Sequence, residues 1–366
     1  MKPWDVVLHI GAPKTGSSAI QRFCRRNRKM LASSGFYYPD HSIDNNGVSG
    51  GHSFVSGPLL QDNLELAEKN FNICLQEARR RKLPLVLSAE GFYRKAEALA
   101  RMTQGLSVRV IGFFRSPVEA LVSAHNQMVK RHFLAQRLKT FCQQKVMQEN
   151  ANLSGECLHH WADTFGDAQC FFLPYDSAAY RESSIELDFL QAIGVQAEQR
   201  ERFHLDRQWV NRSYTPAALE LKRLLNSVLT TADEALNRDI DTFLQGYSDR
   251  SDEEVARGLT GIDANLVTAL QATFADTNRR LMERFTTLRR GLDTSVTPDK
   301  KAASVRPARL NLSIPLEALF ASHPELEEVI YERVASRLSE ARSNPALAKL
   351  ADLLGFEVDE PVGIDT

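Results

Sequence analysis

Hydrophobic residues follow two different spacings along the first two hundred residues of the chain. Short apolar runs bounded by turn residues predict buried strands at about residues 4–10, 84–89, 107–115 and 169–174. Apolar residues that recur every three or four positions predict helices over about residues 16–33, 58–82, 117–138 and 149–165. Alternating strands and helices are typical of a parallel sheet covered by helices on both faces. We therefore expect an α/β fold.

The pattern changes after residue 215, where helical spacing continues in segments to about residue 290 and no strand is predicted. A polar, proline-containing stretch follows, and a last helical segment is predicted at about 325–354. The expected organisation is an α/β core over residues 1–230 and a mainly helical C-terminal extension over residues 231–366. Within that extension, residues 291–309 are expected to form a flexible segment.

Composition narrows the class of partner and the compartment. The 45 basic and 46 acidic side chains give a net charge of −1, which provides no general attraction to nucleic acid. The five cysteines lack the CxxC spacing of a zinc site and favour a reducing compartment. No apolar run approaches the roughly 18 residues of a membrane span, and no signal-peptide core is found. We expect a cytoplasmic protein without an integral membrane segment.

A glycine-containing turn follows the first predicted strand. Gly11 and Gly16 have the spacing of a P-loop, in which backbone N–H groups surround a phosphate at the start of a helix. In a P-loop NTPase the lysine after the second glycine reaches the β- and γ-phosphates. Here Ser17 occupies that position, and the one lysine of the turn, Lys14, lies inside the loop. This difference argues against ATP as the ligand.

The segment Pro13-Lys14-Thr15-Gly16-Ser17-Ser18 resembles the 5′-phosphosulfate loop, usually PKTGTT, of the sulfotransferases that use 3′-phosphoadenosine 5′-phosphosulfate (PAPS). The resemblance implies that Lys14 contacts the oxygen between phosphate and sulfate. It also implies that the 5′-phosphate is bound by Thr15, Gly16, Ser17 and Ser18.

A second segment resembles the 3′-phosphate motif of the same family. Arg115 ends the third predicted strand, Pro117 suits the first turn of the following helix, and Ser123 lies about two helical turns further on. An arginine and a serine placed in this way can converge on one phosphate. The alternative is a charged strand end and a surface serine. The resemblance extends over residues 4–230, and it implies that Tyr175 lies near the adenine.

Glu90 is the candidate general base, because it follows the second predicted strand, whose carboxyl end opens on the same crevice. Several carbohydrate and protein sulfotransferases use a glutamate in this role. The alternative is a glutamate that caps the helix beginning near Phe92. The nine histidines of the chain offer rival candidates for the base. Among them, His52 follows two glycines in the irregular stretch 36–57 and is a lower-ranked candidate for acceptor binding.

The expected function is therefore transfer of a sulfuryl group from PAPS to a hydroxyl or amine, with adenosine 3′,5′-bisphosphate as the other product. Resemblance to bacterial, carbohydrate-type members suggests a carbohydrate or hydroxylated small molecule as acceptor. The mechanism requires no metal, because the donor already carries a good leaving group. A nucleotide-dependent kinase with an aberrant P-loop and a non-catalytic nucleotide-binding protein of the same fold remain the alternatives. The sequence identifies neither the acceptor nor the oligomeric state.

Overall fold

The computed structural model describes most of the chain. The described residues are 4–42, 50–176, 179–180, 184–205, 214–250, 263–289 and 310–358. The chain divides into two compact units: the first comprises residues 1–120, 149–208 and 271–295, and the second comprises residues 121–148, 209–270 and 296–366. The sequence predicts one boundary near residue 230. The units instead interleave, because helices such as α6 (Pro117–Arg131) start in one unit and end in the other. The segment expected to be flexible, 291–309, lies outside the described residues.

A four-stranded parallel sheet forms the centre of the first unit. Its strands are β1 (Val6–Ile10), β2 (Leu85–Ala89), β3 (Val108–Phe114) and β4 (Cys170–Pro174), in the order β2-β1-β3-β4. All four lie where the apolar runs predict them, and the predicted α/β class is confirmed. The register places His9 of β1 beside Ser88 of β2 and Ile111 of β3.

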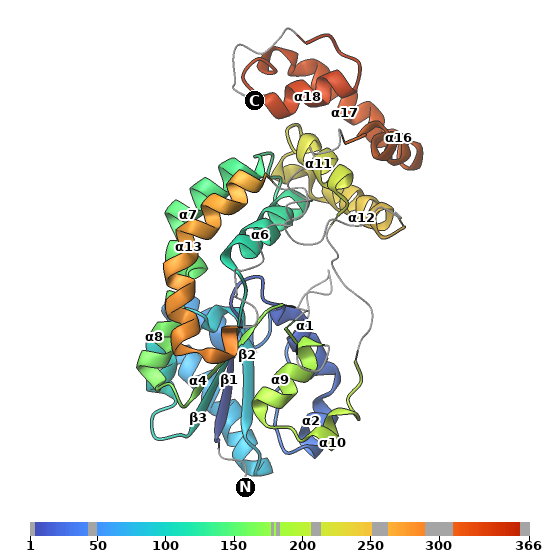
Figure 1. Ribbon diagram of the computed structural model, residues 1–366. Helices are drawn as coiled ribbons and strands as arrows, with labels where there is room; N and C mark the ends of the chain where they lie inside the picture. The colour runs from blue at the N-terminus through green and yellow to red at the C-terminus, as the bar shows by residue number, and fades with distance from the viewer. Residues whose placement is uncertain are drawn as a thin grey trace. The chain divides into compact units, whose positions relative to one another are not determined.

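Helices cover both faces of this sheet. They are α1 (Ser17–Arg26), α2 (Arg28–Ser33), α3 (Ser53–Leu60), α4 (Leu64–Arg81), α5 (Ala96–Met102), α8 (Glu156–Phe165), α9 (Ile185–Ile193) and α10 (Ala197–Arg200), with the 3₁₀ turns η1 (Glu90–Phe92) and η3 (Thr286–Leu288). Val6, Leu8 and Ile10 of β1 belong to the apolar layer that includes α4 and α8, whereas Val7 belongs to the layer that includes α1 and α9. Figure 1 shows these two pairs of helices on opposite sides of the strands. Alternation along β1 thus directs successive side chains into two separate cores.

Two of the predicted helices are each interrupted by an asparagine. Asn27 separates α1 from α2, and its amide donates to the Phe23 carbonyl. Asn63 lies between α3 and α4, where its side chain accepts a hydrogen bond from the Leu66 amide and caps the second helix. Asparagine competes for backbone hydrogen bonds at helix ends, so it starts a new helix although the apolar spacing continues.

All the regular secondary structure among the described residues of the second unit is helical. In addition to parts of α6, α7 (Leu138–Leu153) and α13 (Ala264–Arg284), it contains α11 (Pro216–Leu225), η2 (Thr231–Asp233), α12 (Glu234–Arg250), α16 (Ser313–Ser322), α17 (Pro324–Ser336), η4 (Leu338–Glu340) and α18 (Pro345–Leu353). A single apolar cluster includes side chains from α11, α12, α16, α17 and α18. The predominance of helix after the sheet agrees with the sequence pattern.

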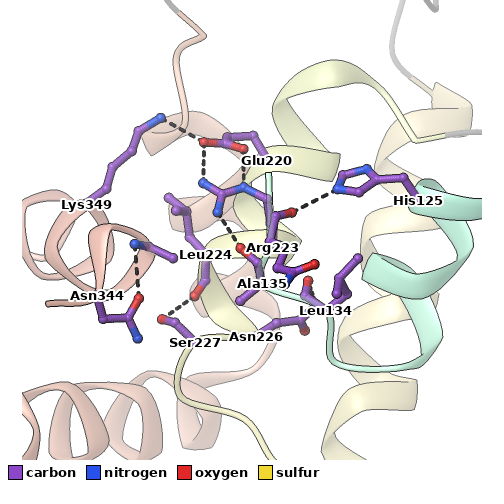
Figure 2. Close-up of polar contacts among 12 residues, drawn as sticks. His125, Leu134, Ala135, Glu220, Arg223, Leu224, Asn226, Ser227, Asn344 and Lys349 are labelled. Atoms are coloured by element: carbon purple, nitrogen blue, oxygen red, sulfur yellow. Dashed lines mark hydrogen bonds and ion pairs between the residues drawn. The ribbon is translucent and has the colours of Figure 1, made fainter. Parts of the chain in front are cut away.

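Arg223 of α11 and Asn226, which directly follows α11, bind the end of α6 and the loop after it. Asn226 Nδ2 donates to the carbonyls of Val129 and Leu134, at 2.8 and 2.9 Å. Arg223 donates to the Ala135 carbonyl at 2.6 Å and pairs with Glu220 (Figure 2). These contacts satisfy carbonyl groups that lack helical partners, so the loop is fixed without secondary structure of its own.

Lys222 is fully buried in the same unit. Its ammonium group donates to Asn226 Oδ1, and it lies over the Phe133 ring, 5.9 Å from the ring centroid. Burial lowers the pKa of Lys222 to about 7, an effect that the charge of Asp241 partly offsets.

Among the helices that the structure describes, none is both long enough and apolar enough to cross a membrane.

Candidate functional site

One residue from each strand end defines the candidate site. Gly11, Glu90, Arg115 and Tyr175 directly follow β1, β2, β3 and β4, respectively. Because the strands are parallel, their carboxyl ends lie at the same edge of the sheet, which is where open α/β sheets bind ligands. The contacts below show that these four residues meet around the loop between β1 and α1.

The loop leads directly into the N-terminus of α1. Gly16 precedes the helix with φ 74°, and no side chain caps it. The first backbone hydrogen bonds of the helix come from the amides of Ala19 and Ile20, both to the Gly16 carbonyl. The amides before them point out of the helix end, where the helix dipole favours an anion. Lys14 also has a left-handed backbone, with φ 64°, which is uncommon for a residue other than glycine.

Two of the hydroxyls predicted to bind phosphate face the interior of the loop. Thr15 is 1% exposed, and its Oγ1 donates to the Ala12 carbonyl at 2.7 Å. Ser17 is also 1% exposed, and a Cβ built on Gly11 would lie 2.2 Å from its Oγ. Lys14, Gly16 and Ser18 are half-buried. In this conformation the loop therefore presents Lys14, Gly16 and Ser18 to solvent rather than the hydroxyls of Thr15 and Ser17.

Arg115 connects the end of β3 to this loop. Its Nη1 donates to the Lys14 carbonyl at 3.5 Å, and its guanidinium group lies over the Tyr175 ring, 5.2 Å from the centroid. The Tyr175 ring in turn lies against Gly16, where an added Cβ would be 2.7 Å from Cε2. Sequence reasoning proposed Tyr175 as an adenine neighbour; the structure places it beside the loop glycine, within the same group of residues as Arg115.

Glu90 lies on the other side of the loop. Its Cγ would be 3.3 Å from a Cβ on Gly11. Although its side chain is exposed, surrounding protein desolvates the carboxylate and raises the pKa of Glu90, while the charge of Lys14 acts in the opposite direction. Glu90 opens η1, but no side-chain hydrogen bond caps this turn. The capping role considered as the alternative for Glu90 is therefore absent from the described contacts.

Ser123 and Arg115 belong to different units. Ser123 is half-buried on the part of α6 that belongs to the second unit, whereas Arg115 belongs to the first. Their convergence on one phosphate stays a prediction.

His52 lies within the protein rather than in the candidate site. It is fully buried, and its Nδ1 accepts a hydrogen bond from the Ser88 amide at 2.9 Å. Its Nε2 therefore carries the proton and donates to the Pro39 carbonyl at 3.2 Å. Burial lowers the pKa of His52 to about 3. Both ring nitrogens of His52 are bound to backbone groups, so His52 links the segment at Pro39 to Ser88 of β2. We assign it this structural role in place of the acceptor-binding role that its neighbouring glycines suggested.

With this geometry established, the chain was compared with known proteins. No family model, no curated protein and no solved structure matches it. Its function is therefore inferred from the site residues themselves.

Glu119 is a site residue that sequence reasoning missed. Its Oε2 lies 3.2 Å from Arg115 Nε. The available signal was the spacing, since an acidic residue four positions after an arginine at the start of a helix can form an ion pair with it. Within the described ranges, no group of three or more histidine, cysteine, aspartate or glutamate side chains is placed to hold a metal ion.

Proposed function

We propose that the protein is a PAPS-dependent sulfotransferase with a P-loop-type nucleotide site. The observation that carries the proposal is the arrangement of Lys14 and Glu90 beside the uncapped N-terminus of α1, with Arg115 bound to the same loop. A cation, a carboxylate with a raised pKa and a helix terminus that favours anions supply the charges that sulfuryl transfer requires.

Lys14 acts on the leaving group. In the transfer, an acceptor oxygen or nitrogen forms a bond to sulfur while the bond from sulfur to the phosphate oxygen breaks, and negative charge develops on that oxygen. The ammonium group of Lys14 neutralises this charge. Its left-handed backbone and the contact of its carbonyl with Arg115 fix where the side chain leaves the loop.

Glu90 accepts the proton of the attacking group. Desolvation raises the pKa of its carboxyl, which makes the carboxylate a stronger base, and its exposed side chain remains accessible to an acceptor. The products are the sulfated acceptor, adenosine 3′,5′-bisphosphate and a proton held by Glu90. A carbohydrate or another hydroxylated small molecule is the proposed acceptor class.

The nucleotide is held by the loop and by Arg115. The amides at the start of α1, together with half-buried Ser18, bind the 5′-phosphate in this proposal, whereas the hydroxyl of Thr15 donates to the Ala12 carbonyl within the loop. Arg115 binds the 3′-phosphate. The structure gives Nη2 of Arg115 no hydrogen bond to any residue that it describes, and the Arg115 side chain is one-fifth exposed.

Calorimetric titration tests the proposal without knowledge of the acceptor. Adenosine 3′,5′-bisphosphate, AMP, and ATP with Mg²⁺ are titrated in turn into the full-length protein. Selective binding of the bisphosphate supports the proposed donor site, and incubation with PAPS and a panel of sugars and phenols then tests transfer. A preference for ATP would favour the kinase alternative. Bisphosphate binding without sulfuryl transfer to any acceptor would favour a non-catalytic nucleotide-binding protein of the same fold.

A further inference from the structure

Three buried polar side chains lie between α1 and the sheet. They are His9 on β1 and Ser17 and Gln21 on α1, which we call the α1 polar row. All three are 1% exposed or less, and buried apolar side chains of the same helix, Ile20, Phe23 and Cys24, lie in the same layer. A polar row in such a layer requires hydrogen-bond partners.

Four atoms of the row lack partners among the residues that the structure describes. These atoms are Nε2 of His9, Oγ of Ser17, and both Nε2 and Oε1 of Gln21. Each buried donor or acceptor left unsatisfied is costly, and natural proteins contain few of them. Four such atoms on three neighbouring side chains indicate that a further molecule completes the network.

Ser88 of β2 lies next to two members of the α1 polar row. Its hydroxyl contacts His9 Nδ1 at 2.7 Å. Its carbonyl lies beside Gly51, where an added Cβ would be 2.1 Å from that oxygen and 2.7 Å from Gln21 Nε2. Ser17 lies one helical turn before Gln21, on the same face of α1. His9 and Gln21 thus both adjoin Ser88, and Ser17 extends the row towards Gly11.

A molecule that completes this network must be small, uncharged and able both to donate and to accept hydrogen bonds. It must be small because the side chains around it exclude solvent. It needs no charge because the row carries none: burial lowers the pKa of His9 to about 3, so the imidazole is neutral at physiological pH. It must donate to Gln21 Oε1 and accept from Gln21 Nε2.

We propose that the α1 polar row binds internal water beneath the phosphate loop, with hydrogen bonds to Gln21, His9 and Ser17. This water forms part of the folded structure and orients the Ser17 hydroxyl under Gly11. The inference depends on packing alone, so it is independent of the proposed function.

A crystal structure of the full-length protein at about 1.5 Å resolution tests the site directly. We expect density for at least one water molecule within hydrogen-bond distance, about 2.7–3.2 Å, of the Gln21 amide and of His9 Nε2. A dry interface at these atoms would overturn the proposal, as would rotamers in which the protein itself satisfies all four atoms.

The variant Gln21→Leu distinguishes a hydrated row from a dry one. If water is bound, leucine removes two of its partners and leaves His9 and Ser17 unsatisfied, so Tm falls by at least about 3 °C. If the row is dry, leucine removes two unsatisfied atoms and Tm rises, which would contradict the proposal. Gln76→Leu, at an exposed position of α4, is the matched control and should change Tm by less than about 1 °C.

Discussion

Arg115 Nε lies 3.2 Å from Glu119 Oε2, one helical turn later in the chain. The carboxylate takes the Nε side of the guanidinium group, while Nη1 donates to the Lys14 carbonyl and the plane of the group lies over Tyr175. Arg115 is therefore held from three directions before any ligand arrives. An arginine positioned in this way loses little side-chain entropy when it binds a phosphate.

Glu119 should therefore act as a positioning residue for Arg115. We expect Glu119→Ala to reduce the preference for adenosine 3′,5′-bisphosphate over AMP by about twofold to fivefold, the range of a partly exposed ion pair. Glu119→Gln keeps an acceptor for Nε and should retain most of the preference. The ratio of the calorimetric Kd values for AMP and the bisphosphate measures this preference.

Tighter bisphosphate binding by the Glu119→Ala variant would show instead that Glu119 competes with the phosphate for Arg115. A wild-type protein that does not distinguish the nucleotides would contradict the proposed function rather than this role.

Arg115→Ala should weaken bisphosphate binding by at least about tenfold, because a charge-assisted hydrogen bond to the 3′-phosphate is lost. AMP binding should also weaken, by no more than about threefold, since Arg115 contacts the Lys14 carbonyl of the loop. Titration of both nucleotides gives the comparison, with exposed Arg26 changed to alanine as the control. Equal losses for both nucleotides would remove Arg115 from the 3′-phosphate site.

Glu90→Gln should lower the transfer rate by about 10²- to 10⁴-fold and change nucleotide affinity by less than about twofold, as expected for a general base. In the wild-type protein the rate should rise with pH through a pKa above the ordinary glutamate value, because desolvation raises the pKa of Glu90. The rise of the transfer rate with pH should be absent from the Glu90→Gln variant. Exposed Glu65→Gln is the matched control. An unchanged pH profile would assign the base to another residue.

The neutral state of buried His52 should make stability depend on pH. Its pKa is about 3 in the folded protein and about 6.5 when unfolded. The unfolded chain therefore binds more protons below pH 6.5, and the free energy of unfolding should fall as pH decreases from 6.5 towards 3. The slope from this residue is at most about 1.4 kcal/mol per pH unit. Urea unfolding at several pH values should show a smaller slope for His52→Gln than for wild type. Equal slopes would mean that His52 is charged or exposed in the folded state.

Lys222 should make the free energy of unfolding depend on pH in the range above pH 7. Its pKa is about 7 folded, against an ordinary value of 10.5, so the unfolded chain binds the additional proton between these values. The free energy of unfolding should therefore rise between pH 7 and 10, by at most about 1.4 kcal/mol per pH unit. Lys222→Met should flatten this rise, and it should lower stability at pH 7 by about 1–3 kcal/mol because buried Asn226 Oδ1 loses the donor that Lys222 provides. If the free energy of unfolding of Lys222→Met depended on pH as steeply as that of wild type, the lowered pKa assigned to Lys222 would be contradicted.

The sheet could be predicted because each strand is buried on both faces. Continuous apolar runs such as Val6 to Leu8, bounded by turn residues, are typical of such strands, and the predicted strand ends then identify Glu90 and Arg115. The roles of Thr15 and His52 could not be predicted. Their partners, the Ala12 and Pro39 carbonyls, are backbone groups that carry no sequence signal. Sequence spacing therefore located the loop correctly but did not show which of its hydroxyls face inward.

The interleaved units have a consequence for synthesis of the chain. The apolar layer on the α4 side of the sheet includes Leu281, Phe285 and Leu288, and Thr287 Oγ1 donates to the Phe172 carbonyl at 2.5 Å. Strand β4 is thus complete more than a hundred residues before the chain that covers it has been made. On the ribosome, Phe172 lacks its contact with Phe285 until η3 has emerged from the exit tunnel, although α4, α5 and α8 on the same face have already been made. The α/β unit cannot be obtained whole from any fragment that stops at residue 230.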